Sequence, residues 1–86
     1  MASNTDDQEN QQGAESETMS LEAALSLGVQ NQREGRLKEA AYIYLQILAA
    51  VPDNVDALHL LGVAEHQAGR SESALKLIGR ALALAP

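Results

Sequence analysis

The 86-residue sequence contains no cysteine, phenylalanine or tryptophan, and Tyr42 and Tyr44 are its only aromatic residues apart from two histidines. Without cysteine, neither a disulfide nor a thiolate metal site can hold the chain together. Hydrophobic residues make up 45% of the sequence, and most of them are alanine and leucine. These residue types favour helices over strands and allow helices to pack closely. The composition thus predicts an all-α protein with a core of small and medium aliphatic side chains.

Basic residues are also scarce. The sequence has six Lys and Arg and twelve Asp and Glu, so its formal net charge is −6. No stripe of basic residues is available for nucleic acid, which argues against that class of partner. No apolar run reaches the roughly 18 residues of a membrane span, and the N-terminus does not have the pattern of a secretory signal. We therefore expect a cytoplasmic protein that binds neither nucleic acid nor membranes.

The segment 1–19 is polar and acidic, and it includes no aliphatic side chain larger than alanine other than two methionines. Such a segment cannot bury enough apolar surface to offset the entropy lost on ordering. It is predicted to be a disordered tail whose main effect is on solubility. The alternative is an acidic arm that contacts a partner.

An internal repeat organises the rest of the chain. When the sequence is aligned with itself so that Leu21 matches Val55, the segment Leu21–Pro52 aligns with Val55–Pro86 without a gap. Ten aligned positions are identical: Ala23/Ala57, Leu27/Leu61, Gly28/Gly62, Val29/Val63, Gly35/Gly69, Arg36/Arg70, Ala40/Ala74, Leu48/Leu82, Ala49/Ala83 and Pro52/Pro86. A fixed period of this length is typical of stacked-repeat architectures.

Apolar residues recur at helical spacing within each unit, which predicts four helices. Their expected ranges are 21–34, about 37–50, about 55–67 and 71–84. Gly35 and Gly69 are expected to end the first helix of each unit, and Pro52 and Pro86 follow the second. Because the connections are so short, each pair of helices should form an antiparallel hairpin.

Two further local features follow from the residue types. Helix N-caps are predicted at Ser20, at Asp53 or Asn54, and at Ser71. Gly28 and Gly62 lie inside helices, where glycine costs about 1 kcal/mol relative to alanine. Their matched positions predict that the second helix of each hairpin crosses there at close range, with Ala40 and Ala74 as the facing residues.

This pattern resembles the tetratricopeptide repeat, a helix–turn–helix unit of about 34 residues. In the second unit the typical positions of the repeat hold Leu58, Leu61, Gly62, Ala74, Ile78, Ala81 and Pro86. In the first unit they hold Ala24, Leu27, Gly28, Ala40, Tyr44, Ile47 and Pro52. The first unit departs further from the pattern, since Ala24 stands where a bulky residue is usual and Ile47 where alanine is usual. The resemblance covers residues 21–86, as one domain of two repeats, 21–54 and 55–86.

The resemblance implies a right-handed superhelix whose first helices line a concave groove for a peptide or helix of another protein. By position, the residues lining this groove would be Glu22, Leu25, Val29, Gln32, Arg33, Asp56, His59, Val63, His66 and Gln67. Leu25, Val29, His59 and Val63 do not supply the Lys, Arg and Asn set with which some members grip a C-terminal carboxylate. Ser26 and Leu60 likewise stand where an asparagine ladder would need Asn.

The last helix carries more apolar residues than packing within its own hairpin requires. They are Leu75, Leu77, Ile78, Leu82 and Leu84. Repeat arrays usually end in a polar capping helix, so we expect an exposed apolar end face that pairs with a second copy, with another protein or with further repeats. The second repeat also resembles bacterial arrays that precede glycosyltransferase-type or sulfotransferase-type domains. A non-catalytic segment of such a protein and a self-assembling structural module are therefore the two alternatives to a protein-binding module.

No group of residues forms a credible catalytic, cofactor or metal site. His59 and His66 are seven positions apart, which is a rise of about 10.5 Å along a helix. Two imidazoles at that separation cannot share one ion, so both are interpreted as polar groove residues. The expectation is a protein that is not an enzyme and has no cofactor.

Overall fold

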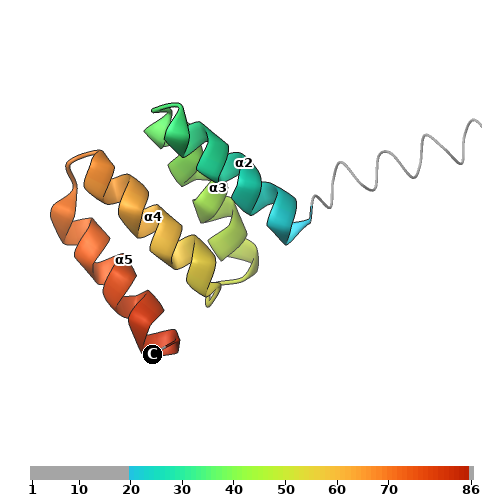
Figure 1. The fold of residues 1–86 in the computed structure, drawn as a ribbon. Coiled ribbons are helices and arrows are strands. Elements are labelled where there is room, and N and C mark those ends of the chain that lie inside the picture. The colour runs from blue at the N-terminus through green and yellow to red at the C-terminus, as the bar shows by residue number, and fades with distance from the viewer. Residues whose placement is uncertain (1–19, 86) are drawn as a thin grey trace, which may run out of the picture.

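The computed structural model describes residues 20–85, and in that range it consists of four helices with no strand (Figure 1). The helices are α2 (Leu21–Arg33), α3 (Leu37–Ala50), α4 (Val55–Gln67) and α5 (Ser71–Leu84). The spacing from the start of α2 to the start of α4 equals that from α3 to α5, and both equal the period of the sequence repeat. The all-α expectation is confirmed. The segment expected to be a disordered tail, residues 1–19, and Pro86 lie outside the described residues.

The first helix of each hairpin begins and ends by the same local chemistry. The Ser20 hydroxyl accepts a hydrogen bond from the Ala23 N–H at 3.1 Å. The Asn54 side chain accepts one from the Ala57 N–H at 2.8 Å. These bonds satisfy N–H groups that have no partner inside the helix. After α2 and α4 the chain turns through a glycine in the left-handed region, with φ of 79° at position 35 and 86° at position 69.

The cap predicted at Ser71 is wrong. Ser71 is the first residue of α5, and Arg70 precedes the helix without a capping side-chain bond. The reason is that the glycine turn closes at Arg70, whose N–H donates to the Glu65 carbonyl at 2.8 Å. Ser71 therefore has helical backbone geometry and is the first residue of the helix. α3 begins in the same way after Arg36, whose N–H donates to the Asn31 carbonyl.

The hydrophobic core lies mainly where the two hairpins meet. One buried cluster is formed by Ala40, Tyr44 and Ile47 of α3 and by Ala57, Leu61 and Ala64 of α4. α2 packs against α3 and also touches α4, whereas α5 packs against α4 alone among the described helices. The helices therefore form a short stack with α2 and α5 at its two ends (Figure 1). We call the contact between α3 and α4 the internal joint.

Gly28 of α2 and Gly62 of α4 are required by close packing, as predicted. A Cβ atom at Gly62 would lie 2.7 Å from Ile78 Cγ1 and 3.3 Å from the Ala74 carbonyl oxygen. A Cβ atom at Gly28 would fall on the ring of Tyr44. Ala40 is therefore not the residue that faces Gly28, because the tyrosine ring extends along α3 and occupies that space.

Candidate functional site

A hydrogen-bonded chain of three side chains joins α2, α3 and α4 at the groove. The Tyr44 hydroxyl donates to Gln32 Oε1 at 2.7 Å. Gln32 Nε2 in turn donates to Gln67 Oε1 at 2.9 Å. Tyr44 is fully buried, and burial raises the pKa of its phenol above the ordinary value of 10.0. The phenol therefore stays protonated as a donor and fixes the orientation of both amides.

A shallow pocket of about 170 Å³ lies beside this chain, where α2 meets α4. It is lined by Val29, Gln32, Arg33, Leu60 and Gln67. All of these except Leu60 were predicted from the sequence to line the groove. Leu60 was left out of the predicted lining, although the resemblance placed it at the position of an asparagine ladder and it precedes Val63 and Gln67 by three and seven positions on the same helix face.

A second hollow of about 490 Å³ extends along α2 and shares Val29 and Arg33 with the first. Leu25, Ser26 and Gln30 complete its lining. The two hollows lie along the same face of α2, contain apolar side chains and have Val29 and Arg33 in common. Arg33 is exposed, whereas Leu25 and Val29 are half-buried.

The remaining residues predicted for the groove lie on α2 and α4 but outside these two hollows. Glu22, Asp56, His59 and His66 are exposed, and Val63 is half-buried. The structure therefore brings together Val29, Gln32, Arg33 and Gln67 but does not draw the two histidines into the same pocket. Their part in binding remains a prediction.

The residues predicted for the apolar end face divide into two groups. Leu75, Leu82 and Leu84 are exposed on α5. Leu77 and Ile78 are half-buried, because Leu77 packs against the core cluster and Ile78 lies against Gly62. The apolar surface that α5 presents is thus narrower than the sequence suggested.

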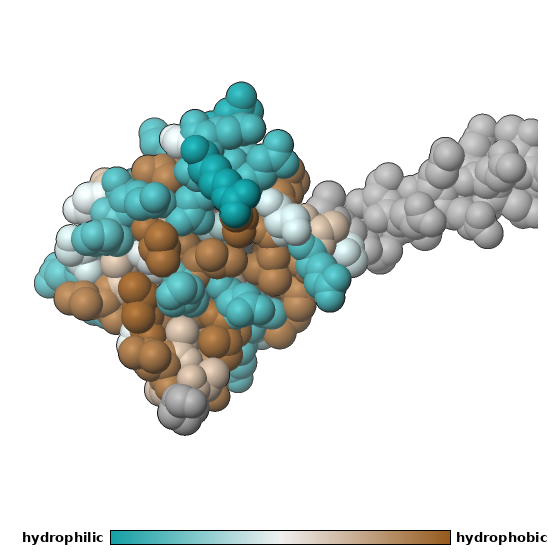
Figure 2. Space-filling view, viewed as in Figure 1, coloured by the Kyte–Doolittle hydropathy of each residue, from teal (hydrophilic) through white to brown (hydrophobic). Residues whose placement is uncertain are grey.

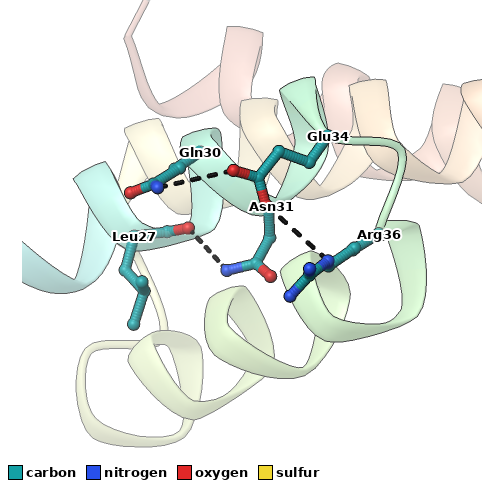
Figure 3. A network of polar contacts seen from close by, with 5 residues as sticks. All are labelled: Leu27, Gln30, Asn31, Glu34 and Arg36. Atoms are coloured by element: carbon teal, nitrogen blue, oxygen red, sulfur yellow. Dashed lines mark hydrogen bonds and ion pairs between the residues drawn. The ribbon is translucent and has the colours of Figure 1, made fainter.

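The polar contacts near the turns lie within a helix or between the end of a helix and the turn that follows it. Figure 3 shows Asn31 donating to the Leu27 carbonyl at 2.8 Å and Glu34 lying 3.7 Å from Arg36. In the second hairpin Arg70, the counterpart of Arg36, pairs with a different residue and lies 3.2 Å from the mostly buried carboxylate of Glu65, which stands at the position of Asn31. Both pairs join residues at the end of one helix to the turn that follows it.

The tetratricopeptide repeat family model matches residues 32–86, which is more than half of the chain. No curated protein matched the sequence. None of the helices in residues 20–85 is long and apolar enough to cross a membrane. Repeats of this family are in general non-catalytic modules for protein–protein interaction. The repeat period, the paired glycines and the family match together show that the chain belongs to the tetratricopeptide repeat family.

Proposed function

We propose that the chain binds a peptide or helix of another protein in the groove between α2 and α4. The observation that carries this proposal is the pocket where Val29 and Arg33 of α2 meet Leu60 and Gln67 of α4. Apolar side chains beside a few fixed polar groups are what peptide-binding surfaces use, the former for affinity and the latter for orientation.

The amides of the groove are held in place before any ligand arrives. Gln32 is bonded to both Tyr44 and Gln67, so less side-chain entropy is lost when a partner binds to these groups. Arg33 is exposed at the edge of both hollows and can donate to a carbonyl or carboxylate of the partner. The ligand favoured by this arrangement has an apolar side chain next to an acceptor or acidic group.

The test is a selection of short peptides by display on the wild-type chain, followed by calorimetric titration of the best binder. Val29→Glu places a charge in the pocket and is expected to weaken binding at least about tenfold, which corresponds to about 1.4 kcal/mol. Arg33→Ala is expected to weaken binding of the acidic peptides most.

The matched control is Leu45→Glu, which adds the same charge at an exposed leucine of α3 that lines none of these hollows. It should bind like the wild type. If Val29→Glu and Arg33→Ala also bound like the wild type, the groove would not be the binding surface.

A self-assembling module is the second candidate function. It is favoured by the exposure of Leu75 and Leu82 on α5, which among the described helices contacts only α4. Assembly through this helix and peptide binding in the groove use different surfaces and can coexist.

A further inference from the structure

The internal joint shows how one repeat covers the next. α4 presents Ala57, Leu61 and Ala64 to α3, and all of them are buried in one cluster with Ala40, Tyr44 and Ile47. On the α3 side, Ala41 and Leu48 are half-buried and pack against the same cluster. Ala41 also lines a hollow together with Ala64 and Ala68, which places it next to the end of α4.

Two of the three α4 residues of this joint, Ala57 and Leu61, are repeated on α2, where no described helix covers them, whereas Gln30 stands at the position of Ala64. Ala23 and Leu27 stand one repeat period before Ala57 and Leu61 and are identical to them. Leu61 is 4% exposed, whereas Leu27 is 41% exposed. We call Ala23 and Leu27 the leading face.

The two half-buried α3 residues at the joint, Ala41 and Leu48, have counterparts on α5 that the described helices leave uncovered. Leu75 and Leu82 stand one repeat period after Ala41 and Leu48. They are 72% and 63% exposed. Figure 2 shows hydrophobic side chains gathered along the edge of the molecule where α5 lies in Figure 1. We call Leu75 and Leu82 the trailing face.

The two exposed faces are complementary halves of a contact that the molecule already makes once. The identical positions in these faces are Ala23/Ala57, Leu27/Leu61 and Leu48/Leu82, whereas Leu75 stands where the joint has Ala41. Because α2 and α5 do not touch each other, the two faces of one copy cannot cover each other. A second copy of the chain supplies the matching face for each.

We infer that copies of this chain stack head to tail, with the trailing face of one copy packed on the leading face of the next. Each junction repeats the geometry of the internal joint. Such a contact joins two different surfaces, so it does not close on itself in a pair and a third copy can be added. The inference rests on the second candidate function, self-assembly, and on the exposed ends of the stack, and it is independent of ligand binding in the groove.

The test is molar mass by light scattering behind a sizing column, over a wide range of concentrations. The wild type is expected to exceed the 9.1 kDa chain mass and to keep growing with concentration. Leu27→Glu removes the leading face and Leu82→Glu the trailing face, so each variant alone is expected to stay monomeric. Leu75→Glu, at the most exposed leucine, is a second trailing-face variant with little effect on folding.

Mixing the variants separates this inference from other modes of assembly. An equimolar mixture of Leu27→Glu and Leu82→Glu has one intact face from each partner and is expected to give a species of twice the 9.1 kDa chain mass. Recovery of assembly also shows that both variants are folded. The control Leu45→Glu, at a leucine that is 53% exposed outside both faces, should assemble like the wild type.

Three results would overturn the inference. A wild type that stays monomeric at every concentration would show that the faces do not pair. A symmetric dimer through α5 would leave Leu27→Glu dimeric and the mixture without a new species. Loss of assembly in Leu45→Glu would place the contact elsewhere. None of these results would affect the proposed groove, which is tested by peptide binding.

Discussion

Gly28 and Gly79 both lie inside helices, but an added methyl group would meet different surroundings at each. At Gly28 it would fall on the ring of the fully buried Tyr44, whereas at Gly79 there is open space. Gly28→Ala is therefore expected to lower the free energy of unfolding by about 1–3 kcal/mol, since overpacking outweighs the gain in helix propensity. Gly79→Ala is expected to raise it by about 0.5–1 kcal/mol.

Urea unfolding followed by circular dichroism checks this pair. The two substitutions are chemically identical and both lie in helices, so their difference isolates the packing term. Equal shifts in the same direction would contradict the close approach of Tyr44 to α2.

Tyr44 makes stability sensitive to alkaline pH. Burial raises the pKa of its phenol above 10.0, so the unfolded chain loses this proton at a lower pH than the folded chain. The stabilising contribution is complete below about pH 10 and is lost as pH rises through the higher pKa of the folded state. Tyr44→Phe is expected to flatten the alkaline decline in thermal melting temperature.

Tyr44→Phe also removes the hydrogen-bond donor to Gln32, so it should lower the free energy of unfolding by about 0.5–1.5 kcal/mol at neutral pH. Tyr42→Phe, at an exposed tyrosine, is the matched control for removing a phenol. An alkaline decline in Tyr44→Phe as steep as in the wild type would show that another group is responsible.

At the scale of the elements, one difference between the first helices of the two hairpins changes how each hairpin is packed. Leu58 of α4 is fully buried, whereas its counterpart in α2 is Ala24. A hollow of about 550 Å³ opens beside Ala24. It is lined by Leu21, Ala24, Leu27, Tyr42, Ile43, Gln46, Ile47, Ala50 and Val51. The first hairpin is thus underpacked where the second is filled.

Ala24→Leu is expected to raise the free energy of unfolding by about 1 kcal/mol, because the added methylene groups enter an apolar hollow. Leu58→Ala is expected to lower it by about 2–5 kcal/mol. Thermal and urea unfolding of both variants give the comparison. A destabilised Ala24→Leu would mean that the hollow cannot accept the shape of a leucine.

The helices themselves could be predicted well from the sequence. Glycines with positive φ at positions 35 and 69 end α2 and α4, and the apolar period sets the bounds of all four. The capping of α5 could not be predicted, because a serine before a helix and a serine that begins it look alike. The backbone hydrogen bond from the Arg70 N–H to the Glu65 carbonyl closes the turn before Ser71, so that Ser71 begins the helix and does not cap it.

At the scale of the whole molecule, the groove could be predicted only in part. The resemblance to the tetratricopeptide repeat predicted Gln32 and Gln67 as groove residues, but their mutual hydrogen bond joins residues 35 apart in sequence and depends on how α2 packs on α4. Packing likewise explains why Leu77 and Ile78 are half-buried, although they resemble Leu75 and Leu82 in sequence. The spacing of apolar residues along one helix does not show which face of that helix is covered by a neighbouring helix.

The order of contacts along the stack has a consequence for how the chain folds and opens. No described helix touches another that is more than two helices away in sequence, so most loops closed during folding are short and folding is expected to be fast. Stability in such a stack is shared between neighbours and can be lost locally. Because α5 is held by α4 alone among the described helices, its amide protons should exchange with solvent before those of the internal joint. Any molecule that packs on α5 would slow that exchange and extend the cooperative unit by one helix.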